Sequence, residues 1–253
     1  MLLLVRPQQS LQASLDNFQE QGFSCVGLAV QAIKFDTQQS KVFERDSTHF
    51  QQNKPANKAW FDFIIITSQF AVEGLAKQLT KSALTLSDLA TQFICIGDAT
   101  ALAIHKLNPS IQVIVPEQQN SEGILDLPVF ANIENQRVAI LKGEGGRKLI
   151  AKELTTRGAA VSEYTLYKRT KIEPNVNQLA TVNPAIEIVV VASGEAAVIL
   201  LEQPQLAHLK RQTWVVNSQR IAKLIKQHGV SSVYISAGAS DSALIKCIQQ
   251  IME

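Results

Sequence analysis

Short apolar runs alternate with amphipathic stretches along most of the chain. Most of the runs lack polar alternation, which is typical of strands buried on both faces of a parallel sheet. They predict strands at Leu2–Val5, Cys25–Val30, Phe63–Thr67, Phe93–Ile96, Val113–Val115, Val138–Leu141, Val161–Leu166, Ile188–Val191, Trp214–Val216 and Val233–Ile235. Between them, the spacing of apolar residues predicts helices at Leu11–Gln21, Ala71–Gln78, Thr100–Leu107, Arg147–Arg157, Glu195–Leu201, Ile221–His228 and Asp241–Ile251. Strands that alternate with helices predict a doubly wound α/β fold.

The chain also repeats itself. Leu3–Val5, Gly22 and Val30 match Ala139–Leu141, Gly158 and Leu166, and the offset between the two members is the same in all three matches. Three further matches begin at Phe63 and Ile188, at Phe93 and Trp214, and at Val113 and Val233, with offsets that decrease slowly along the chain. Four matches in the same order favour two copies of one α/β domain over a chance likeness among apolar strands.

Two polar segments, Lys34–Asn57 and Lys168–Asn183, are poor in predicted strands. We interpret them as the places where the chain crosses between domains. If the first β-α-β unit, residues 1–33, packs with the last third of the chain, the middle forms a self-contained domain. The pattern alone leaves a simple tandem arrangement open.

Composition narrows the class of protein. The chain has 253 residues, of which 46% are hydrophobic and 18% charged, as expected for a globular protein with a large core. A net charge of +2 without clustering argues against a nucleic-acid interface. The N-terminal apolar run is too short for a signal peptide, and no run reaches the roughly 18 apolar residues of a membrane span. Three scattered cysteines, Cys25, Cys95 and Cys247, indicate buried thiols in a reducing compartment, so we expect a cytoplasmic protein.

Small or hydroxylic residues follow nearly every predicted strand, where open parallel sheets bind ligands. These residues are Thr67, Ser68, Gly97, Thr100, Ser121, Gly143, Gly145, Gly146, Ser193, Gly194, Ser218 and Ser240. Capping of the following helix is the ordinary role of each hydroxyl. As a set, they would also line a cleft that binds several carboxylates.

The glycine-rich turn before the helix at Arg147 predicts an anion site, because backbone N–H groups and the helix dipole converge there. The turn lacks the G-x-G-x-x-G spacing of dinucleotide sites, and the chain contains no Walker A motif. Its four histidines have no metal-ligand spacing, and no G-x-S-x-G elbow is present. Arg6, Lys142 and Arg147 are either partners for ligand carboxylates or solvated surface cations. Tyr167, at the end of the next strand, is either a proton donor or a buried phenol with a hydrogen-bonded hydroxyl.

An ordered series of short motifs extends over essentially the whole chain. It consists of Val5-Arg6-Pro7, Thr67-Ser68-x-x-Ala71-Val72, Ile96-Gly97-x-x-Thr100-Ala101, Ser121-Glu122, Lys142-Gly143-x-Gly145-Gly146-Arg147, Arg157-Gly158-Ala159, Tyr167-x-Arg169, Ser193-Gly194 and Ser218-x-Arg220. Each motif is common by itself, but the ordered set resembles the uroporphyrinogen-III synthase family.

The resemblance implies an α/β fold with two similar flavodoxin-like domains. Each contains a parallel sheet, a two-stranded connector joins them, and a cleft lies between them. Residues 1–33 with 172–253 are expected to form domain 1, and residues 39–166 domain 2. Residues 34–38 and 167–171 are the expected connectors.

The same resemblance implies a cofactor-free, monomeric lyase of heme and other porphyrin biosynthesis. It would cyclise hydroxymethylbilane, a linear tetrapyrrole octacarboxylate, to uroporphyrinogen III with loss of water and inversion of ring D. Tyr167 matches the tyrosine to which the family's chemistry is most often assigned. The implied substrate-binding residues are Arg6, Thr67, Ser68, Gly97, Thr100, Ala101, Ser121, Lys142, Gly143, Gly145, Gly146, Ser193, Gly194 and Ser218. The alternative hypothesis is a non-catalytic cytoplasmic two-domain binding or sensor protein for an anionic metabolite.

Overall fold

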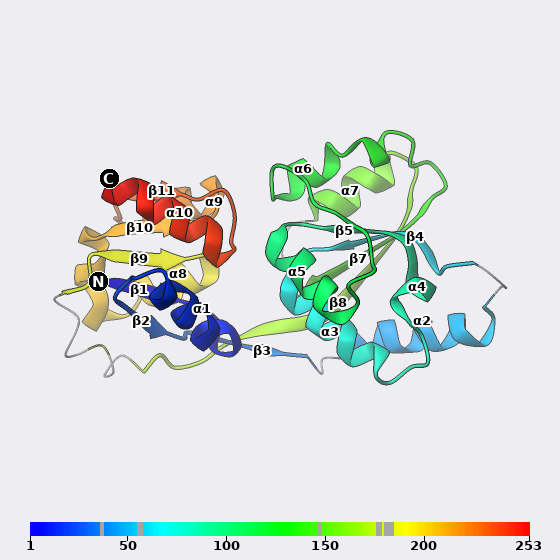
Figure 1. Ribbon diagram of the computed structural model, residues 1–253, viewed down its shortest axis with the longest axis horizontal. Coiled ribbons are helices and arrows are strands. Elements are labelled where there is room, and N and C mark those ends of the chain that lie inside the picture. The colour runs from blue at the N-terminus through cyan, green and yellow to red at the C-terminus, as the bar shows by residue number, and fades with distance from the viewer. Residues whose placement is uncertain (36–37, 55–57, 146–147, 176–178, 180–184) are drawn as a thin grey trace. The chain divides into compact units, whose positions relative to one another are not determined.

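The structure is a computed structural model that describes residues 1–35, 38–54, 58–145, 148–175, 179 and 185–253. The chain forms two compact units (Figure 1). Unit 1 consists of Met1–Ile33 and Thr170–Glu253, and unit 2 of Lys34–Arg169. Each unit contains a sheet of parallel strands with helices packed against it. The predicted α/β class with parallel sheets is therefore confirmed.

Unit 1 is built on a five-stranded parallel sheet in the order β11-β10-β9-β1-β2. The strands are β1 (Leu2–Val5), β2 (Cys25–Leu28), β9 (Ile188–Val191), β10 (Thr213–Val216) and β11 (Val233–Ile235). The helices are α1 (Gln8–Glu20), α8 (Gly194–Leu201), α9 (Gln219–Gln227) and α10 (Asp241–Met252), with a 3-10 helix η4 (Pro204–Arg211). If the five strands are numbered in chain order and read from the β2 edge, the order is 2-1-3-4-5, which is that of flavodoxin-like sheets.

The inner strand β1, which lies between β9 and β2, explains the continuous apolar runs. Leu3 and Val5 belong to the core layer that contains residues of α8 and α9. The alternate residues Leu2 and Leu4 belong to the opposite layer, which contains Phe18 of α1 and residues of α10. Because helices cover both faces of the sheet, every side chain of this strand is buried and no polar alternation is possible.

A second sheet has six strands in the order β3-β8-β7-β4-β5-β6, and its strands from β4 to Arg169 of β8 belong to unit 2. The strands are β3 (Gln31–Lys34), β4 (Phe61–Ile66), β5 (Ala90–Cys95), β6 (Val113–Ile114), β7 (Arg137–Gly143) and β8 (Ala160–Lys171), and those from β4 to β8 pair in parallel. The helices are α2 (Ser40–Gln52), α3 (Gln69–Leu79), α4 (Leu86–Leu89), α5 (Asp98–Leu107), α6 (Ser121–Leu125) and α7 (Leu149–Thr156), with a 3-10 helix η1 (Pro128–Phe130). On one face, residues of α6 and α7 pack on the strands.

The two sheets match position by position in the way that the sequence repeat predicts. In spatial order, β2-β1-β9-β10-β11 of unit 1 corresponds to β8-β7-β4-β5-β6 of unit 2. The strand registers correspond as well at the offsets found in the sequence. The matched pairs are Val5–Leu28 with Leu141–Tyr164, Leu3–Val189 with Ala139–Ile64, Val189–Trp214 with Ile64–Phe93, and Trp214–Val233 with Phe93–Val113. The two units are therefore permuted copies, because β1 comes first among the five matched strands of unit 1 and its counterpart β7 comes fourth among those of unit 2.

The polar segment before residue 58 was expected to be a strand-poor crossing, and most of it forms helix α2, which the sequence pattern did not predict. Phe43 of this helix is 1% exposed and packs on the rings of Trp60 and Tyr164. The rest of the helix surface is mainly polar, so its single buried stripe was hidden in the composition of the segment. Residues 36–37 and 55–57 lie outside the described part of the chain.

Strand β8 is longer than predicted, and Tyr167 lies inside it rather than at its end. Its last residues lie beside β3, a strand that the sequence pattern missed. Thr170 Oγ1 donates to Ala32 O at 3.3 Å, and Ile172 N donates to Val30 O at 3.1 Å. Pairing with a segment far away in sequence therefore extends β8 to Lys171.

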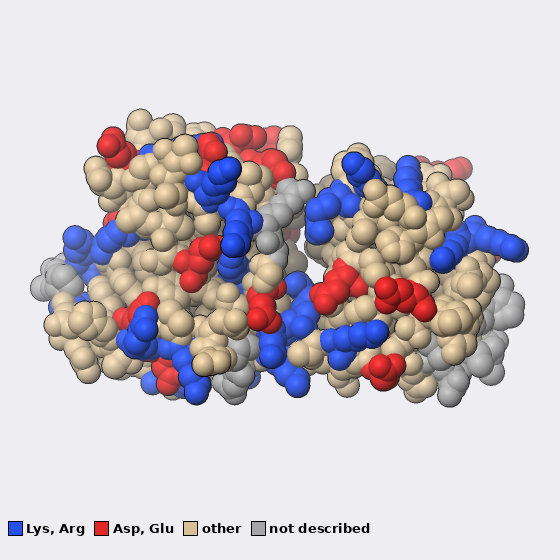
Figure 2. Space-filling model, turned by 180° about the vertical axis from the view of Figure 1, so that it is seen from behind, with Lys and Arg blue, Asp and Glu red and all other residues tan. Residues whose placement is uncertain are grey.

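Basic and acidic side chains are interspersed on the face drawn in Figure 2, as the small net charge suggests. Within the described ranges, no helix is both long and apolar enough to cross a bilayer.

Candidate active site

The hydroxyl of Tyr167 lies in a small network of donors within unit 2. Only 2% of the Tyr167 surface is exposed. Its phenol oxygen accepts a hydrogen bond from Ser68 Oγ at 2.9 Å and another from Arg169 Nη2 at 3.1 Å. A phenol oxygen has two lone pairs and one proton to donate. Both acceptor positions are thus used, and the proton is left for a further partner.

Ser68 owes its orientation to the helix that follows it. It directly follows β4 and is the N-cap of α3, where its Oγ accepts the backbone N–H of Ala71 at 3.2 Å. Since this bond uses the oxygen as an acceptor, the hydroxyl hydrogen is free to go to Tyr167. The start of α3 therefore fixes the serine, and the serine fixes the phenol.

Gly143 gives the tyrosine ring its space. A Cβ at this position would lie 2.5 Å from Tyr167 Cζ and 2.8 Å from the hydroxyl oxygen, far inside van der Waals contact. The next residue, Glu144, donates its backbone N–H to the carbonyl of Tyr167 at 2.8 Å. On another side the ring packs against Phe70, with ring centres 5.7 Å apart. Glycine is needed here because of close packing rather than an unusual backbone angle.

Arg169 places positive charge at the same point. It lies two residues after Tyr167 in β8, so both side chains are on one face of the strand. The guanidinium carbon is 5.3 Å from the centre of the tyrosine ring. Its Nε is buried and has no hydrogen-bond partner among the described residues. A cation with an unused, buried donor suits an anionic group of a ligand.

The other tyrosine of β8, Tyr164, has a structural environment. Its ring lies edge-on to Phe43, and its hydroxyl donates to Asp46 at 3.3 Å. Burial, followed by the negative charge of Asp46, raises the pKa of Tyr164. Its proton is thus held in place, whereas that of Tyr167 has no acceptor in the described part of the chain.

The Tyr167 network lies at the topological switch point of its sheet. Strands β7 and β4 are neighbours at the centre, and the connections from them lead to opposite halves of the sheet. Ligands of open parallel sheets bind beyond the carboxyl ends of the strands at such a point. Thr67 is also there, with its Oγ1 donating to Leu141 O at 3.2 Å.

The predicted anion cradle after β7 is less cationic than expected. Lys142 Nζ forms an ion pair with Glu163 of the neighbouring strand, which balances its charge. Gly145 has a φ of 76°, a left-handed backbone that favours glycine. Gly146 and Arg147, both predicted to contribute, lie outside the described residues.

The end of β5 provides another group of predicted residues, which are largely covered. Gly97 lies under Gln119, whose Oε1 would be 2.4 Å from a Cβ at that position. Thr100 and Ala101 in α5 are 3% and 8% exposed. At the start of α6 the cap is Asn120, which accepts from Gly123 N at 2.8 Å, and not the predicted Ser121.

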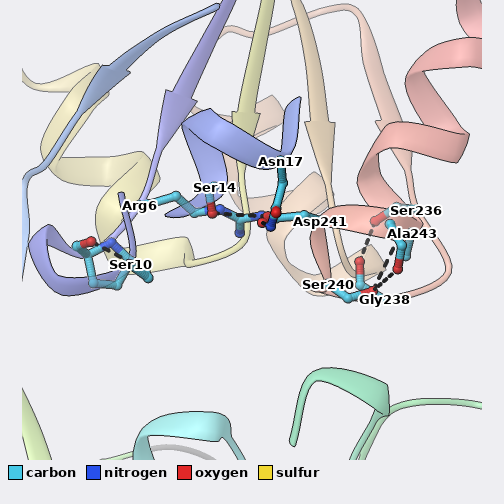
Figure 3. A network of polar contacts seen from close by, with 11 residues as sticks. Arg6, Ser10, Ser14, Asn17, Ser236, Gly238, Ser240, Asp241 and Ala243 are labelled. Atoms are coloured by element: carbon cyan, nitrogen blue, oxygen red, sulfur yellow. Dashed lines mark hydrogen bonds and ion pairs between the residues drawn. The ribbon is translucent and has the colours of Figure 1, made fainter. Parts of the chain in front are cut away.

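In unit 1, Arg6 is held by an acidic partner (Figure 3). Its Nη2 forms an ion pair with Asp241 at the start of α10, and its side chain is 9% exposed. Asp241 also accepts hydrogen bonds from Ser14 Oγ at 3.1 Å and Asn17 Nδ2 at 2.8 Å. The network joins β1, α1 and α10, so the charge of Arg6 is balanced within the protein.

The remaining predicted residues of unit 1 form helix N-termini. Ser193 Oγ accepts from Ala196 N at 3.3 Å and caps α8, which begins at Gly194. Ser218 caps α9 by accepting from Ile221 N at 3.4 Å. Capping accounts for these hydroxyls, and their contact with a ligand stays a prediction.

The structure therefore brings Ser68, Gly143 and Tyr167 into direct contact, with Thr67 and Lys142 next to them in sequence. The candidates that follow β1, β5, β6, β9 and β10 lie at other strand ends. Sequence reasoning did not select Arg169, although the spacing Tyr167-x-Arg169 places both on one face of a strand. Nor did it identify Asp241 as the partner of Arg6. Among the described residues, no cluster of three or more His, Cys, Asp or Glu could hold a metal ion.

Comparison with known proteins gives one family. The family model described as uroporphyrinogen-III synthase HemD matches residues 12–246. The uroporphyrinogen-III synthase of Escherichia coli (strain K12) is 32% identical over 198 residues, which cover 74% of this chain and 78% of that protein. The enzyme of the same name from Salmonella typhimurium is 31% identical over 195 residues, which cover 74% and 78%.

Two solved structures share the fold at low sequence identity. A mutant uroporphyrinogen III synthase from Thermus thermophilus matches with a TM-score of 0.58 and 15% identity, covering 100% of this chain and 97% of that one. The uroporphyrinogen-III synthetase from Helicobacter pylori matches with a TM-score of 0.54 and 13% identity, covering 99% and 100%. With the family model spanning most of the chain and a relative at 32% identity, the chain belongs to the uroporphyrinogen-III synthase family, whose enzyme is a cyclising lyase of tetrapyrrole synthesis.

Proposed function

We propose that the chain converts hydroxymethylbilane, a linear tetrapyrrole octacarboxylate, into uroporphyrinogen III with release of water. The observation that carries the assignment of the chemistry is the Tyr167 network. Its phenol oxygen accepts bonds from Ser68 and Arg169 and keeps a proton to donate. The family assignment supplies the reaction, and this network supplies the group that starts it.

In the proposed first step, Tyr167 donates its proton to the departing hydroxyl of the substrate, which leaves as water. The pyrrole nitrogen supplies the electron pair and keeps its own proton, so the electrophile that forms is a protonated azafulvene. The phenolate oxygen left behind keeps its two donors, Ser68 and Arg169, so its charge forms against groups that are already oriented. Only small movements are then needed during the step.

The later steps are controlled by geometry. Ring D attacks the azafulvene methylene through the α-carbon that already carries its bridge to ring C, which gives a spiro intermediate. That bridge bond then breaks, and the free α-carbon of ring D bonds to the released bridge carbon, so the macrocycle closes with ring D inverted. The proton lost on closure returns to the phenolate. Without positioning, the azafulvene closes to the uninverted type I ring. Correct placement of reacting groups contributes on the order of 7–11 kcal/mol in favourable intramolecular cases.

Acetate and propionate groups need donors at several points. We assign this role to the predicted strand-end residues Thr67, Ser68, Gly97, Thr100 and Ser121 in unit 2, and to Ser193, Gly194 and Ser218 in unit 1. Arg169 is added to them because its buried Nε has no partner among the described residues. Arg6 and Lys142 are weaker candidates, since Asp241 and Glu163 already balance their charges.

We further propose that the protein acts as a cytoplasmic monomer. The three cysteines are free thiols, as is usual in a reducing compartment. The proposed functional domains are residues 1–33 with 172–253 and residues 39–166, joined by 34–38 and 167–171, and the matched strand orders of the two sheets support them.

The deciding experiment supplies freshly generated hydroxymethylbilane, oxidises the products and separates the isomers. We expect type III product to form faster than spontaneous closure. Type I product alone, at the spontaneous rate, would contradict the proposal. Binding of the bilane without any type III product would indicate a non-catalytic binding or sensor protein instead.

A further inference from the structure

Gln31 occupies in unit 1 the position that Tyr167 occupies in unit 2. The constant offset that relates Leu3 of β1 to Ala139 of β7 also relates Gln31 to Tyr167. Two structural features confirm this alignment. Gly22 and Gly158, which are related by the same offset, have left-handed φ angles of 83° and 87°. The register of β1 with β2 equals that of β7 with β8 at the same offset.

The hydrogen-bond partner is repeated as well. Ser193 corresponds to Ser68 at the offset that relates β9 to β4, and each caps the helix that follows its strand. Ser68 Oγ donates to the hydroxyl of Tyr167, and Ser193 Oγ donates to Oε1 of Gln31 at 3.3 Å. The same serine-to-polar bond is thus present in both units, with a carboxamide in place of the phenol.

The other end of the carboxamide has no partner. Gln31 is 1% exposed, and its Nε2 is buried without a hydrogen bond to any described residue. In this orientation of the amide, Ser193 Oγ accepts the N–H of Ala196 and gives its hydrogen to Oε1, and Nε2 is the end that is left without a partner. Buried polar groups are normally satisfied, and an unsatisfied one in a native protein calls for an explanation.

An acceptor belonging to the substrate provides that explanation. The Nε2 group carries two N–H donors, and carboxylates accept such bonds strongly. An amide has no proton to give at neutral pH, so Gln31 is suited to binding and not to proton donation. Tyr167 is buried to a similar degree, so contact with a ligand requires movement of neighbouring groups in both units.

We propose that Gln31, oriented by Ser193, is a substrate-binding residue whose Nε2 donates to a carboxylate of the tetrapyrrole. This inference rests on the proposed function, because that function provides the carboxylates. The two units would then have different roles. Both contain the same serine contact, but at this position unit 2 has the proton-donating phenol of Tyr167 and unit 1 has the carboxamide of Gln31.

The test compares Gln31→Met with Gln78→Met. Gln78 is a matched control, because it is 5% exposed and its Oε1 is also buried without a described partner, but it lies in the last turn of α3. A hydrogen bond to a charged group is lost only at Gln31, so its KM for hydroxymethylbilane should rise about ten- to a hundredfold. Its kcat should not change, because the bond is expected in the ground state and the transition state alike.

Equal KM values for the two variants, or a lower melting temperature for Gln31→Met with an unchanged KM, would overturn the proposal. If Gln31→Met does not fold, Gln31→Glu keeps the oxygen that accepts from Ser193 and places negative charge where Nε2 was. We expect its KM to rise further, and an unchanged KM would refute the role.

Binding of uroporphyrinogen III under anaerobic conditions separates the two proposals. If the native protein binds this octacarboxylate without making it, the proposed function fails. In that case the inference about Gln31 holds if Gln31→Met raises the Kd for uroporphyrinogen III by about tenfold or more relative to Gln78→Met, and it fails if the two Kd values are equal. If the native protein neither binds nor forms the product, both proposals fail.

Discussion

Replacement of Gly143 by alanine separates the position of the Tyr167 ring from its chemistry. The change adds one methyl group and removes no functional group. The new Cβ would lie 2.5 Å from Cζ of the ring and 2.8 Å from its hydroxyl oxygen. Carbon atoms in contact are roughly 3.5–4.0 Å apart, so the ring must move by about 1 Å.

That movement acts on both stability and turnover. Overpacking of a well-filled site costs about 1–3 kcal/mol of unfolding free energy. In proteins of this size each kcal/mol lowers the melting temperature by about 2–4 °C. A displacement of about 1 Å lowers the rate by about a hundredfold when geometry controls the reaction. The ring is held by Phe70, Ser68 and Arg169, so it cannot move without disturbing the donors to its hydroxyl.

The assay measures initial rates of type III product from fresh hydroxymethylbilane, together with thermal unfolding. Gly27→Ala is the control, because its Cβ would lie 2.7 Å from Leu11 Cδ1, the flexible end of a side chain in unit 1. We expect Gly27→Ala to keep kcat and Gly143→Ala to lose about a hundredfold. A folded Gly143→Ala protein with the native kcat would refute the reasoning that the ring position controls the reaction.

Three further changes probe the acid, an ion pair and a thiol. Tyr167→Phe should lower kcat about 10²–10⁴-fold, the usual contribution of general acid catalysis. Tyr164→Phe, which loses the bond to Asp46 away from the Tyr167 network, should stay close to the native rate; equal effects exclude Tyr167 as the acid. Burial tends to raise the pKa of Asp62, but the hydrogen bonds and charge of Arg137 outweigh it and hold the pKa below 3.8. The stability that the ion pair contributes is therefore present above pH 3.8 and lost as pH falls through the lowered value. Urea unfolding should show Asp62→Asn less stable than the native protein at pH 7, with a gap that narrows below pH 3.8; a constant gap would contradict this. Burial raises the pKa of Cys95 to about 12, so at pH 8 a thiol reagent should modify it only after denaturation, and rapid labelling of the folded protein would count against this.

The strands could be predicted where burial on both faces leaves an unbroken apolar run. The predictions for Leu2–Val5 and Ile188–Val191 coincide with β1 and β9. Helix α2 was missed because only one narrow stripe of it, around Phe43, is buried. Strand β3 was missed because it depends on pairing with β8, which comes much later in the chain, and the local pattern contains no sign of that partner.

The site shows the same division between local and distant information. Tyr167 could be selected from a motif of neighbouring residues. The ion pair between Arg6 and Asp241, in contrast, joins residues 235 positions apart. A sequence pattern shows that arginine is a cation but not that its charge is already balanced. Arg169 was present in a motif, and only the position of its side chain reveals the bond to the phenol oxygen.

The permuted order of the two units has a consequence for synthesis on the ribosome. All strands from β4 to β8 are available once Lys171 has been made, because unit 2 is continuous in sequence. Strand β1, an inner strand of the other sheet, pairs Leu2 with Ile188, which is made only after the whole of unit 2. At about 5–20 residues per second the wait is roughly 10–40 s.

During that wait, β1 has only β2 as a sheet neighbour, and a two-stranded sheet is marginally stable in water. Pairing of β3 with β8 brings both crossings of the chain together, as the bond from Thr170 to Ala32 indicates. The chain between β1 and β9 then behaves as a shorter loop, because unit 2 is already folded within it. The entropic cost of bringing β1 and β9 together is therefore lower. Slow folding of unit 2 therefore prolongs the time during which β1, an entirely apolar strand, is open to aggregation. Substitutions that lower the yield of soluble protein by this route can lie far from the sheet that misassembles.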